Sequence, residues 1–263
     1  MNRATVRACL ATGPLMALVF AIGWIAGTRW IPVPGPSMSA EAVAALYVDH
    51  RVSYLIGFTL MVLAVPLLAP WGAALALISR SGERGQPVVA YAQLVLLSCC
   101  VAVFVTLYMP WALAAYRAGE VSAETTHTMH ELGWIMFIFT VPPFALWIAV
   151  LAVGILWSPR EEQLLPRWFA FYSLAEALMI APAALIVFFK TGPLAYDGFL
   201  ALWLPLVSFF VWMQVATVVA WRAVTRGAAV APGAVDRRPT VVPVACLRPV
   251  GETRPLSTSA VDG

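Results

Sequence analysis

An acidic side chain lies deep inside an apolar stretch of this 263-residue chain. Glu176 comes eight residues after Trp168, which is about 12 Å along a helix. A charge near the centre of a bilayer costs roughly 2.5–3.5 kcal/mol, so this carboxyl should face protein and find polar partners. Gln93 and Gln214 reach a similar depth when counted from the ends of their own stretches. We predict that Glu176, Gln93 and Gln214 form a buried polar cluster, either a proton or cation site or interhelical glue.

The three histidines lie at or just before the starts of apolar stretches. Two of them belong to the run Glu124-x-x-His127-x-x-His130-Glu131, and helical spacing puts these side chains on one face or next to it. Imidazole and carboxylate groups can bind zinc, copper or iron, which makes His127, His130 and Glu131 candidate ligands of a transition metal. His50, at the mouth of another stretch, is a fourth candidate. The alternative is that these residues are solvated in a polar loop of 22 residues.

Composition identifies the elements that must carry these residues. Hydrophobic residues make up 62% of the chain and charged residues 11%, whereas soluble domains average about 45–50% and about 25%. The apolar residues form six stretches long enough to cross a bilayer as helices: 8–27, 52–79, 88–109, 132–157, 168–189 and 198–221. We expect an all-α polytopic transmembrane helical bundle of about six spans within residues 1–226. Residues 227–263 are rich in Pro, Gly, Ser, Thr and Val, which predicts a disordered cytoplasmic tail.

The distribution of basic residues predicts the orientation of the spans. With the N-terminus in the cytoplasm, 12 of the 16 arginines and lysines fall on the cytoplasmic side and 4 on the outer side. Because arginine and lysine are enriched in cytoplasmic loops, the N-terminus and the C-terminus should both be cytoplasmic. The net charge of +3 gives no indication of nucleic-acid binding. The expected partners are the lipid bilayer and either another membrane protein or a second copy of the chain.

Tryptophan, proline and serine mark the ends and irregularities of the predicted helices. Five tryptophans near span ends are expected to be interfacial anchors: Trp30, Trp111, Trp157, Trp168 and Trp221. Prolines within spans predict kinks, at Pro66, Pro70, Pro142, Pro143, Pro182 and Pro205. Two Ser-Ala-Glu sequences, at 39–41 and 122–124, predict capped helix starts. The first opens a short surface helix over Ala40–His50, with Leu46 and Tyr47 turned toward lipid or the bundle.

Several loop and span-end motifs carry a resemblance to a known group. They are Trp30–Ser37 (WIPVPGPS), the start Ser39-Ala40-Glu41, and FKTGP at 189–193 followed by WLP at 203–205. In these motifs the chain resembles a group of uncharacterised bacterial multi-span membrane proteins of high-GC actinobacteria, and its 15 arginines against one lysine fit such a genome. The resemblance covers roughly the first 222 residues. It implies a multi-pass protein of the bacterial cytoplasmic membrane and brings no activity or functional residue with it.

Three classes of function are consistent with these features. A small transporter or transport-associated membrane protein would use Glu176 as its ionisable site, and a non-catalytic accessory subunit would need no special residue. A membrane-bound metal-dependent enzyme or redox partner for a lipophilic substrate would use the histidines. The sequence has no Walker loop, nucleophile elbow or dinucleotide fingerprint, which disfavours nucleotide-driven and serine-hydrolase chemistry. We favour the transport-related and accessory classes, with the metal-dependent class as the alternative.

Overall fold

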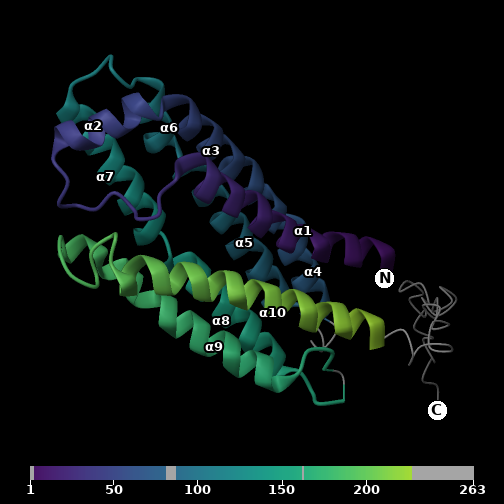
Figure 1. Cartoon of the computed structure of the whole chain (residues 1–263). Coiled ribbons are helices and arrows are strands. Elements are labelled where there is room, and N and C mark those ends of the chain that lie inside the picture. Colours follow the sequence, from purple (N-terminus) through teal and green to yellow (C-terminus); the bar gives the residue numbers. More distant parts are fainter. Residues whose placement is uncertain (1–2, 81–86, 162, 227–263) are drawn as a thin grey trace, which may run out of the picture. The chain divides into compact units, whose positions relative to one another are not determined.

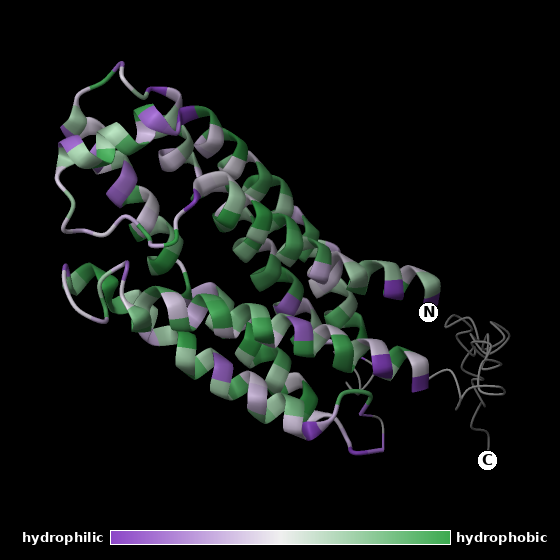
Figure 2. Cartoon of the chain, viewed as in Figure 1, coloured by the Kyte–Doolittle hydropathy of each residue, from purple (hydrophilic) through white to green (hydrophobic). Residues whose placement is uncertain are grey.

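The computed structural model describes residues 3–80, 87–161 and 163–226, and the predicted tail lies outside these residues. Within these ranges the regular elements are all helices. Six stretches are long and apolar enough to cross a membrane: Arg3–Thr28, Arg51–Arg80, Val88–Tyr116, Ala123–Trp157, Arg167–Phe188 and Phe199–Arg226. Each overlaps one predicted span, so the all-α, six-span prediction is confirmed. Figure 2 shows apolar residues running along these helices.

The chain forms a bundle in which α1 begins and α10 ends at the same end (Figure 1). The α-helices are α1 (Arg3–Ile22), α2 (Ala40–Asp49), α3 (Arg51–Ala64), α4 (Leu68–Arg80), α5 (Val88–Thr106), α6 (Met109–Tyr116), α7 (Ala123–Phe139), α8 (Pro142–Trp157), α9 (Arg167–Ile180) and α10 (Leu204–Arg226). We refer to the end with the start of α1 as the terminus end. The opposite end, where α2 and α6 lie, is the α2 end.

Four spans depart from regular α-helix beside prolines that predict kinks, near the middle of the second and fourth spans and toward the α2 end of the fifth and sixth. A 3-10 turn with Pro66 separates α3 from α4, and Pro142 begins α8 directly after α7 has ended. Helix α9 continues as a 3-10 segment, Ala181–Phe188, whose second residue is Pro182. Helix α10 follows a π-helical segment, Phe199–Trp203, and has Pro205 as its second residue. Proline lacks an N–H and clashes with the preceding turn, which explains why regular α-helix stops at these places.

The predicted polar loop between the third and fourth spans is shorter than expected. Of the 22 residues expected to be loop, α6 continues to Tyr116 and α7 already begins at Ala123. The Ser122 hydroxyl caps α7 by accepting a hydrogen bond from the Thr125 N–H at 3.2 Å, as the Ser-Ala-Glu sequence predicts. Ser39 caps α2 in the same way, which confirms the helix start predicted at residues 39–41. The alternative of a 22-residue polar loop was wrong, because the first turns of α7 are helical although their side chains are polar.

The tryptophans divide into two groups, and only one group agrees with an anchor role. Trp157, Trp168 and Trp221, at the terminus end, are 75%, 55% and 40% exposed. Trp30 and Trp111, toward the α2 end, are 1% and 0% exposed, so the anchor prediction was wrong for these two. They are buried because the two rings pack against each other and against aromatic side chains of α3 and α7.

A glycine contact sets the distance between α3 and the end of the first span. A Cβ atom on Gly27 would overlap the backbone of Gly57, and one on Gly57 would lie 2.8 Å from the carbonyl oxygen of Gly23. The Ser53 hydroxyl donates a hydrogen bond to the Gly27 carbonyl across the same contact. Small residues spaced four apart let membrane helices approach backbone to backbone. The Gly23–Gly27 pair facing Gly57 therefore fixes the crossing of these two spans.

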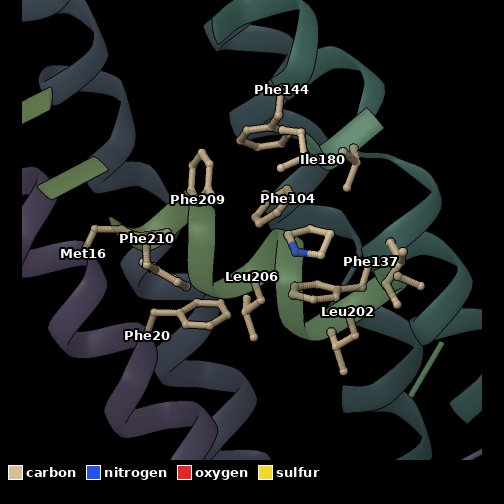
Figure 3. Close-up of a pocket in the computed structure, with 14 residues that line it drawn as sticks. Met16, Phe20, Phe104, Phe137, Phe144, Ile180, Leu202, Leu206, Phe209 and Phe210 are labelled. Carbon is tan, nitrogen blue, oxygen red and sulfur yellow. The ribbon is translucent and has the colours of Figure 1, made fainter. Parts of the chain in front are cut away.

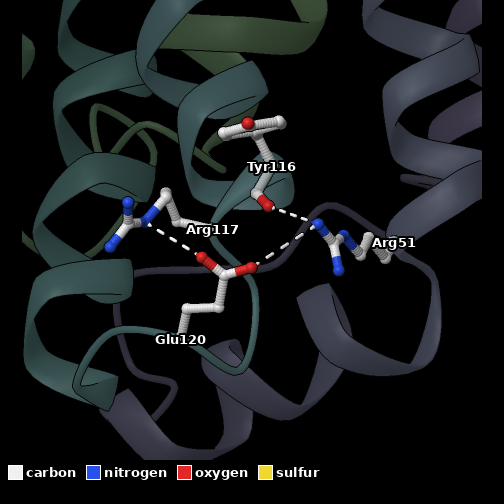
Figure 4. A network of polar contacts seen from close by, with 4 residues as sticks. All are labelled: Arg51, Tyr116, Arg117 and Glu120. Atoms are coloured by element: carbon white, nitrogen blue, oxygen red, sulfur yellow. Dashed lines mark hydrogen bonds and ion pairs between the residues drawn. The ribbon is translucent and has the colours of Figure 1, made fainter.

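A group of charged side chains links α3 to the loop after α6 at the surface of the α2 end (Figure 4). Arg51 donates a hydrogen bond to the Tyr116 carbonyl at 2.7 Å and lies 3.9 Å from the Glu120 carboxylate. Arg117 lies 3.3 Å from the other oxygen of Glu120. All three charged side chains are more than 40% exposed, so these ion pairs are weakened by water.

Candidate functional site

Glu176 is a buried carboxyl with only half of its hydrogen-bonding capacity used. It lies on α9 and is 1% exposed, as its depth in the sequence predicts. The Ser208 hydroxyl on α10 donates a hydrogen bond to its Oε1 at 2.9 Å. The second oxygen, Oε2, is buried and has no partner among the described residues. An ionised carboxylate accepts at both oxygens, whereas a protonated one becomes a donor, so this oxygen is free to take up a proton or another ligand.

The Glu176–Ser208 pair lies one helical turn from an apolar cavity with an accessible volume of about 60 Å³. Ile180, one turn beyond Glu176, and Pro205 and Phe209, beside Ser208, line this cavity. Figure 3 shows aromatic side chains from several helices around it. The remaining lining residues are Met16, Phe20, Phe104, Phe137, Ile138, Val141, Phe144, Ala201, Leu202, Leu206 and Phe210.

The cavity coincides with the helix interruptions. Val141 lies at the α7–α8 break, Ile180 at the end of α9, and Pro205 at the start of α10. Its lining is almost entirely apolar, which favours an apolar occupant over water. The buried carboxyl is therefore adjacent to an apolar space at the junction of broken helices.

The three residues of the predicted polar cluster lie at separate places. The Gln93 amide nitrogen donates a hydrogen bond to the Ser79 hydroxyl at 2.9 Å, between α5 and α4, and its oxygen is buried without a partner among the described residues. Gln214 is half-buried and lines a groove between α1 and α10. Glu176 instead pairs with Ser208, which sequence reasoning missed. The structure thus brings none of the three predicted members together.

A difference in depth between α9 and α10 explains why the wrong partner was predicted. Counting from Trp168 and Trp221 puts Glu176 level with Gln214. In the structure Trp212 donates a hydrogen bond to the Ser173 hydroxyl at 3.0 Å, and Glu176 is level with Ser208. The predicted partner Gln214 and the observed partner Ser208 are six residues apart, or about 9 Å of helix. The difference arises because α10 extends further toward the terminus end than α9 does. The sequence does contain the true partner, Ser208, six residues before Gln214 on the same helix.

The α2 end contains an aromatic cluster built around a buried histidine. His130 is fully buried, and its ring centroid lies 5.6–6.3 Å from those of Trp30, Tyr47, Trp134 and Tyr196. The cluster around it draws rings from six separate segments of the chain: the end of the first span, α2, α3, α6, α7 and the segment that contains Tyr196. The aromatic cluster comprises Trp24, Trp30, Tyr47, Tyr54, Phe58, Trp111, His130, Trp134, Phe137 and Tyr196.

Both ring nitrogens of His130 have hydrogen-bond partners. The Trp134 indole N–H donates to Nε2 at 3.1 Å, and because an indole nitrogen only donates, Nε2 must carry the lone pair. Nδ1 then carries the proton and donates to the Tyr47 hydroxyl at 3.0 Å. The Trp111 indole N–H donates to the His130 carbonyl at 3.0 Å. Since the one free lone pair of the ring is occupied by Trp134, the arrangement holds a neutral imidazole in a fixed tautomer.

Among the described residues, no hydrogen bond or ring contact joins the other candidate metal ligands to the His130 ring. His127 is half-buried and near Glu41 on α2, whose pKa is lowered by hydrogen bonds from its own backbone and Ser39 and, to a lesser degree, by the charge of His127. Glu131 is half-buried, and the His50 ring lies 5.8 Å from that of Tyr54. Across residues 3–80, 87–161 and 163–226, no three His, Cys, Asp or Glu side chains are close enough to hold a metal ion.

Burial also affects two tyrosines of the cluster that lie outside the spans. It raises the pKa of Tyr47 well above its usual value of 10, and it also raises the pKa of Tyr196, where the charges of Glu131 and Asp197 contribute. Both hydroxyls therefore stay protonated in the folded chain. This agrees with Tyr47 acting as a neutral partner of the His130 ring.

Comparison of this chain with protein-family models, with curated proteins and with solved structures finds no match. The functional argument therefore depends on the residues described above. Of these, Glu176 is the buried ionisable side chain whose hydrogen bonding is incomplete and which adjoins a cavity.

Proposed function

We propose that this chain is a small proton-coupled transporter of the bacterial cytoplasmic membrane, with both termini in the cytoplasm. In this proposal Glu176 binds and releases the proton. The apolar cavity beside it holds part of a lipophilic cargo. The half-satisfied Glu176 carboxyl next to the helix breaks is the observation that carries the proposal.

The chemistry of Glu176 supports a proton role. An ionised carboxyl at this depth has to be compensated, yet Ser208 supplies a single hydrogen bond and no basic side chain of the described residues pairs with it. Binding a proton removes the charge and with it most of the cost of burial. A polar ligand or a water that reached Oε2 in another arrangement of the helices would favour the ionised form instead. The proton occupancy of Glu176 is then linked to the arrangement of α9 and α10.

The helix interruptions support a moving role for the same region. Transporters commonly bind substrates near the bilayer midplane between discontinuous helices, because broken helices can pivot at their ends. Here α9 and α10, which carry Glu176 and Ser208, are both irregular at the level of the cavity. A change in their packing would alter the cavity and the surroundings of Glu176 together. Coupling of proton binding at Glu176 to cargo binding in the cavity requires such a joint change.

Two measurements test the proposal. Infrared difference spectra of the reconstituted protein over a pH titration should contain the C=O band of a protonated carboxyl, and Glu176→Gln should remove it. In vesicles with an imposed pH gradient and an internal pH dye, the neutral apolar probe N-phenyl-1-naphthylamine should accelerate proton flux. Glu176→Gln should reduce this flux by about tenfold or more, whereas Ser208→Ala should reduce it less.

Glu161→Gln is the matched control, since Glu161 is an exposed carboxylate in the α8–α9 connection. It should leave both the infrared band and the flux unchanged. A Glu176→Gln variant with an unchanged band and unchanged flux would refute the proton role. An accessory role would then be favoured, and co-purification of a membrane partner would be the observation to seek.

A further inference from the structure

Helix α9 begins and α10 ends at the terminus end of the bundle (Figure 1), and a hollow lies between these two helix ends. Its accessible volume is about 120 Å³, whereas one water molecule needs about 10–15 Å³, so there is room for a group of several non-hydrogen atoms. The residues that line it are Leu164, Pro166, Trp168, Val219, Arg222, Ala223 and Arg226. We refer to this hollow as the arginine pocket.

The charge of the arginine pocket is entirely positive among the residues that the structure describes. Arg222 and Arg226 are four residues apart on α10, so they project from one face of the helix, one turn apart. No aspartate or glutamate is among the described residues that line the pocket. Within the described part of the chain, neither guanidinium forms a hydrogen bond or an ion pair. The two charges thus have no compensating partner among these residues.

Another arginine at this end of the bundle is engaged with protein instead. Arg7 on α1 donates a hydrogen bond to the Thr225 hydroxyl at 3.1 Å, and its guanidinium carbon lies 5.6 Å from the ring centre of Trp221. These contacts give Arg7 a structural role between α1 and α10. Arginines at a membrane boundary commonly extend to water without further function. Arg222 and Arg226 differ from that ordinary case because together they border a hollow large enough for a ligand.

The position of the pocket indicates which kind of anion it fits. Trp168, which lines it, is 55% exposed, and Trp221, next to Arg222, is 40% exposed. Exposed tryptophans of membrane proteins gather where the hydrocarbon meets the headgroups. The phosphate of a glycerophospholipid lies at this level, so it reaches the arginines without leaving its leaflet. The apolar side chains of Leu164 and Val219 in the same pocket suit the first carbons of the acyl chains, which a soluble anion lacks.

We propose that the arginine pocket binds the phosphate of an anionic glycerophospholipid from the leaflet at the terminus end. Arg222 and Arg226 donate charge-assisted hydrogen bonds to the phosphate oxygens, for which the planar guanidinium is well suited. Basic pockets between membrane helices recognise anionic headgroups in this way. A headgroup without an ammonium is favoured, because the described lining offers no carboxylate to pair with one. The site stands independently of the transport proposal, since neither Glu176 nor the apolar cavity takes part in it.

Native mass spectrometry of the full-length protein in mild detergent tests this proposal. The probes are phosphatidylglycerol and phosphatidylcholine with the same acyl chains, and glycerol phosphate, which has the phosphate group without acyl chains. Phosphatidylglycerol should bind at least about tenfold more tightly than phosphatidylcholine, because two arginines attract a net negative headgroup. Arg222→Gln and Arg226→Gln should each weaken its binding about fivefold, and the double variant should weaken it about twentyfold.

Arg80→Gln is the matched control, because Arg80 is an exposed arginine that ends α4 at the same end of the bundle and does not line the pocket. It removes the same charge and should leave the binding of phosphatidylglycerol unchanged. A loss as large as in the pocket variants would overturn the proposal, since net charge alone would then attract the lipid.

The unmodified protein supplies two further decisive outcomes. Equal binding of the two lipids would overturn the proposal, because the pocket would then not select an anionic headgroup. Binding of glycerol phosphate as tight as that of phosphatidylglycerol would overturn it too, and would make the pocket a site for a soluble anion. Because these comparisons use no variant, they decide the question even if an arginine substitution impairs folding.

Discussion

Two of the buried polar side chains of the described residues, His130 and Glu176, lie in opposite kinds of surroundings. His130 is enclosed by the aromatic cluster, and both ring nitrogens and its carbonyl have partners. Glu176 has one partner, one unpaired oxygen and a cavity within a helical turn. Both are almost completely buried, so burial alone does not separate them.

This difference indicates which of the two groups is able to change state. A fully hydrogen-bonded neutral histidine loses interactions whenever it takes up a proton or a metal, because Trp134 occupies its lone pair. A half-bonded carboxyl beside a space can gain a proton or a partner without breaking anything. We infer that the α2 end is a rigid region that supports the bundle, and that the junction of α9 and α10 is the responsive region.

The largest expected effect comes from the glycine contact near the α2 end. In Gly27→Leu the new side chain would meet the backbone of Gly57, which cannot move aside as a side chain could. We expect loss of folded protein, measured as monodisperse yield in mild detergent. Ala26→Leu, at an exposed neighbouring position, should fold normally. Normal yield of Gly27→Leu would mean that the close crossing does not determine the fold.

The next effect tests the structural role of His130. His130→Ala should lower the free energy of unfolding by roughly 3–5 kcal/mol, since it leaves a ring-sized cavity and two unpaired partners. His127→Ala, at a half-buried position one turn earlier, should change it by about 0.5 kcal/mol. Thermal unfolding in detergent would measure both. Elemental analysis adds a decisive control: a stoichiometric metal lost in both variants would reinstate the metal-site prediction and contradict a purely structural role.

A loss of stability at alkaline pH should follow from the two tyrosines with raised pKa values. Below pH of about 10, Tyr47 and Tyr196 are protonated in both folded and unfolded chains, so stability does not change. Above it the unfolded chain ionises first, and stability should fall by up to about 1.4 kcal/mol per pH unit for each residue. Unfolding measured across this range should show a smaller decline in the Tyr196→Phe variant. The exposed control Tyr116→Phe should decline as the unmodified protein does.

A smaller effect, of opposite sign, is expected at Glu176. Glu176→Leu removes the unpaired oxygen, and the Ser208 hydroxyl keeps the Pro205 carbonyl as an acceptor at 3.3 Å. Replacing an incompletely paired buried group by an apolar one is close to neutral, so stability should stay the same or rise by about 1 kcal/mol. Thermal unfolding would measure this alongside the loss of proton flux. A decrease of more than about 2 kcal/mol would show that Glu176 is interhelical glue.

The sequence predicts the parts of this structure that depend on local pattern. Long apolar stretches predict the six spans, and Ser39 and Ser122 predict two helix starts, because hydropathy and capping act within a few residues. The burial of Glu176 also follows from its depth. Its partner does not, because the stagger between α9 and α10 is set by packing between helices.

The aromatic cluster shows the same limit more strongly. His130 obtains its partners from α2 and from its own helix, and Trp30 reaches the cluster from the end of the first span. Tryptophan is equally suited to a membrane boundary and to a buried contact, so its position in the sequence does not distinguish the two. The Gly23–Gly27 spacing, by contrast, was a readable signal for close helix approach.

The smallest expected effect concerns the charged group at the surface of the α2 end. Glu120→Gln removes the negative charge that pairs with Arg51 and Arg117, yet these side chains are half exposed to solvent, so the loss of stability should be below about 1 kcal/mol. The loss should shrink further at high salt, which thermal unfolding at two ionic strengths would measure. The Arg51 hydrogen bond to the Tyr116 carbonyl remains in this variant. A loss comparable to that of His130→Ala would mean that exposed charges, rather than the aromatic cluster, hold this end together.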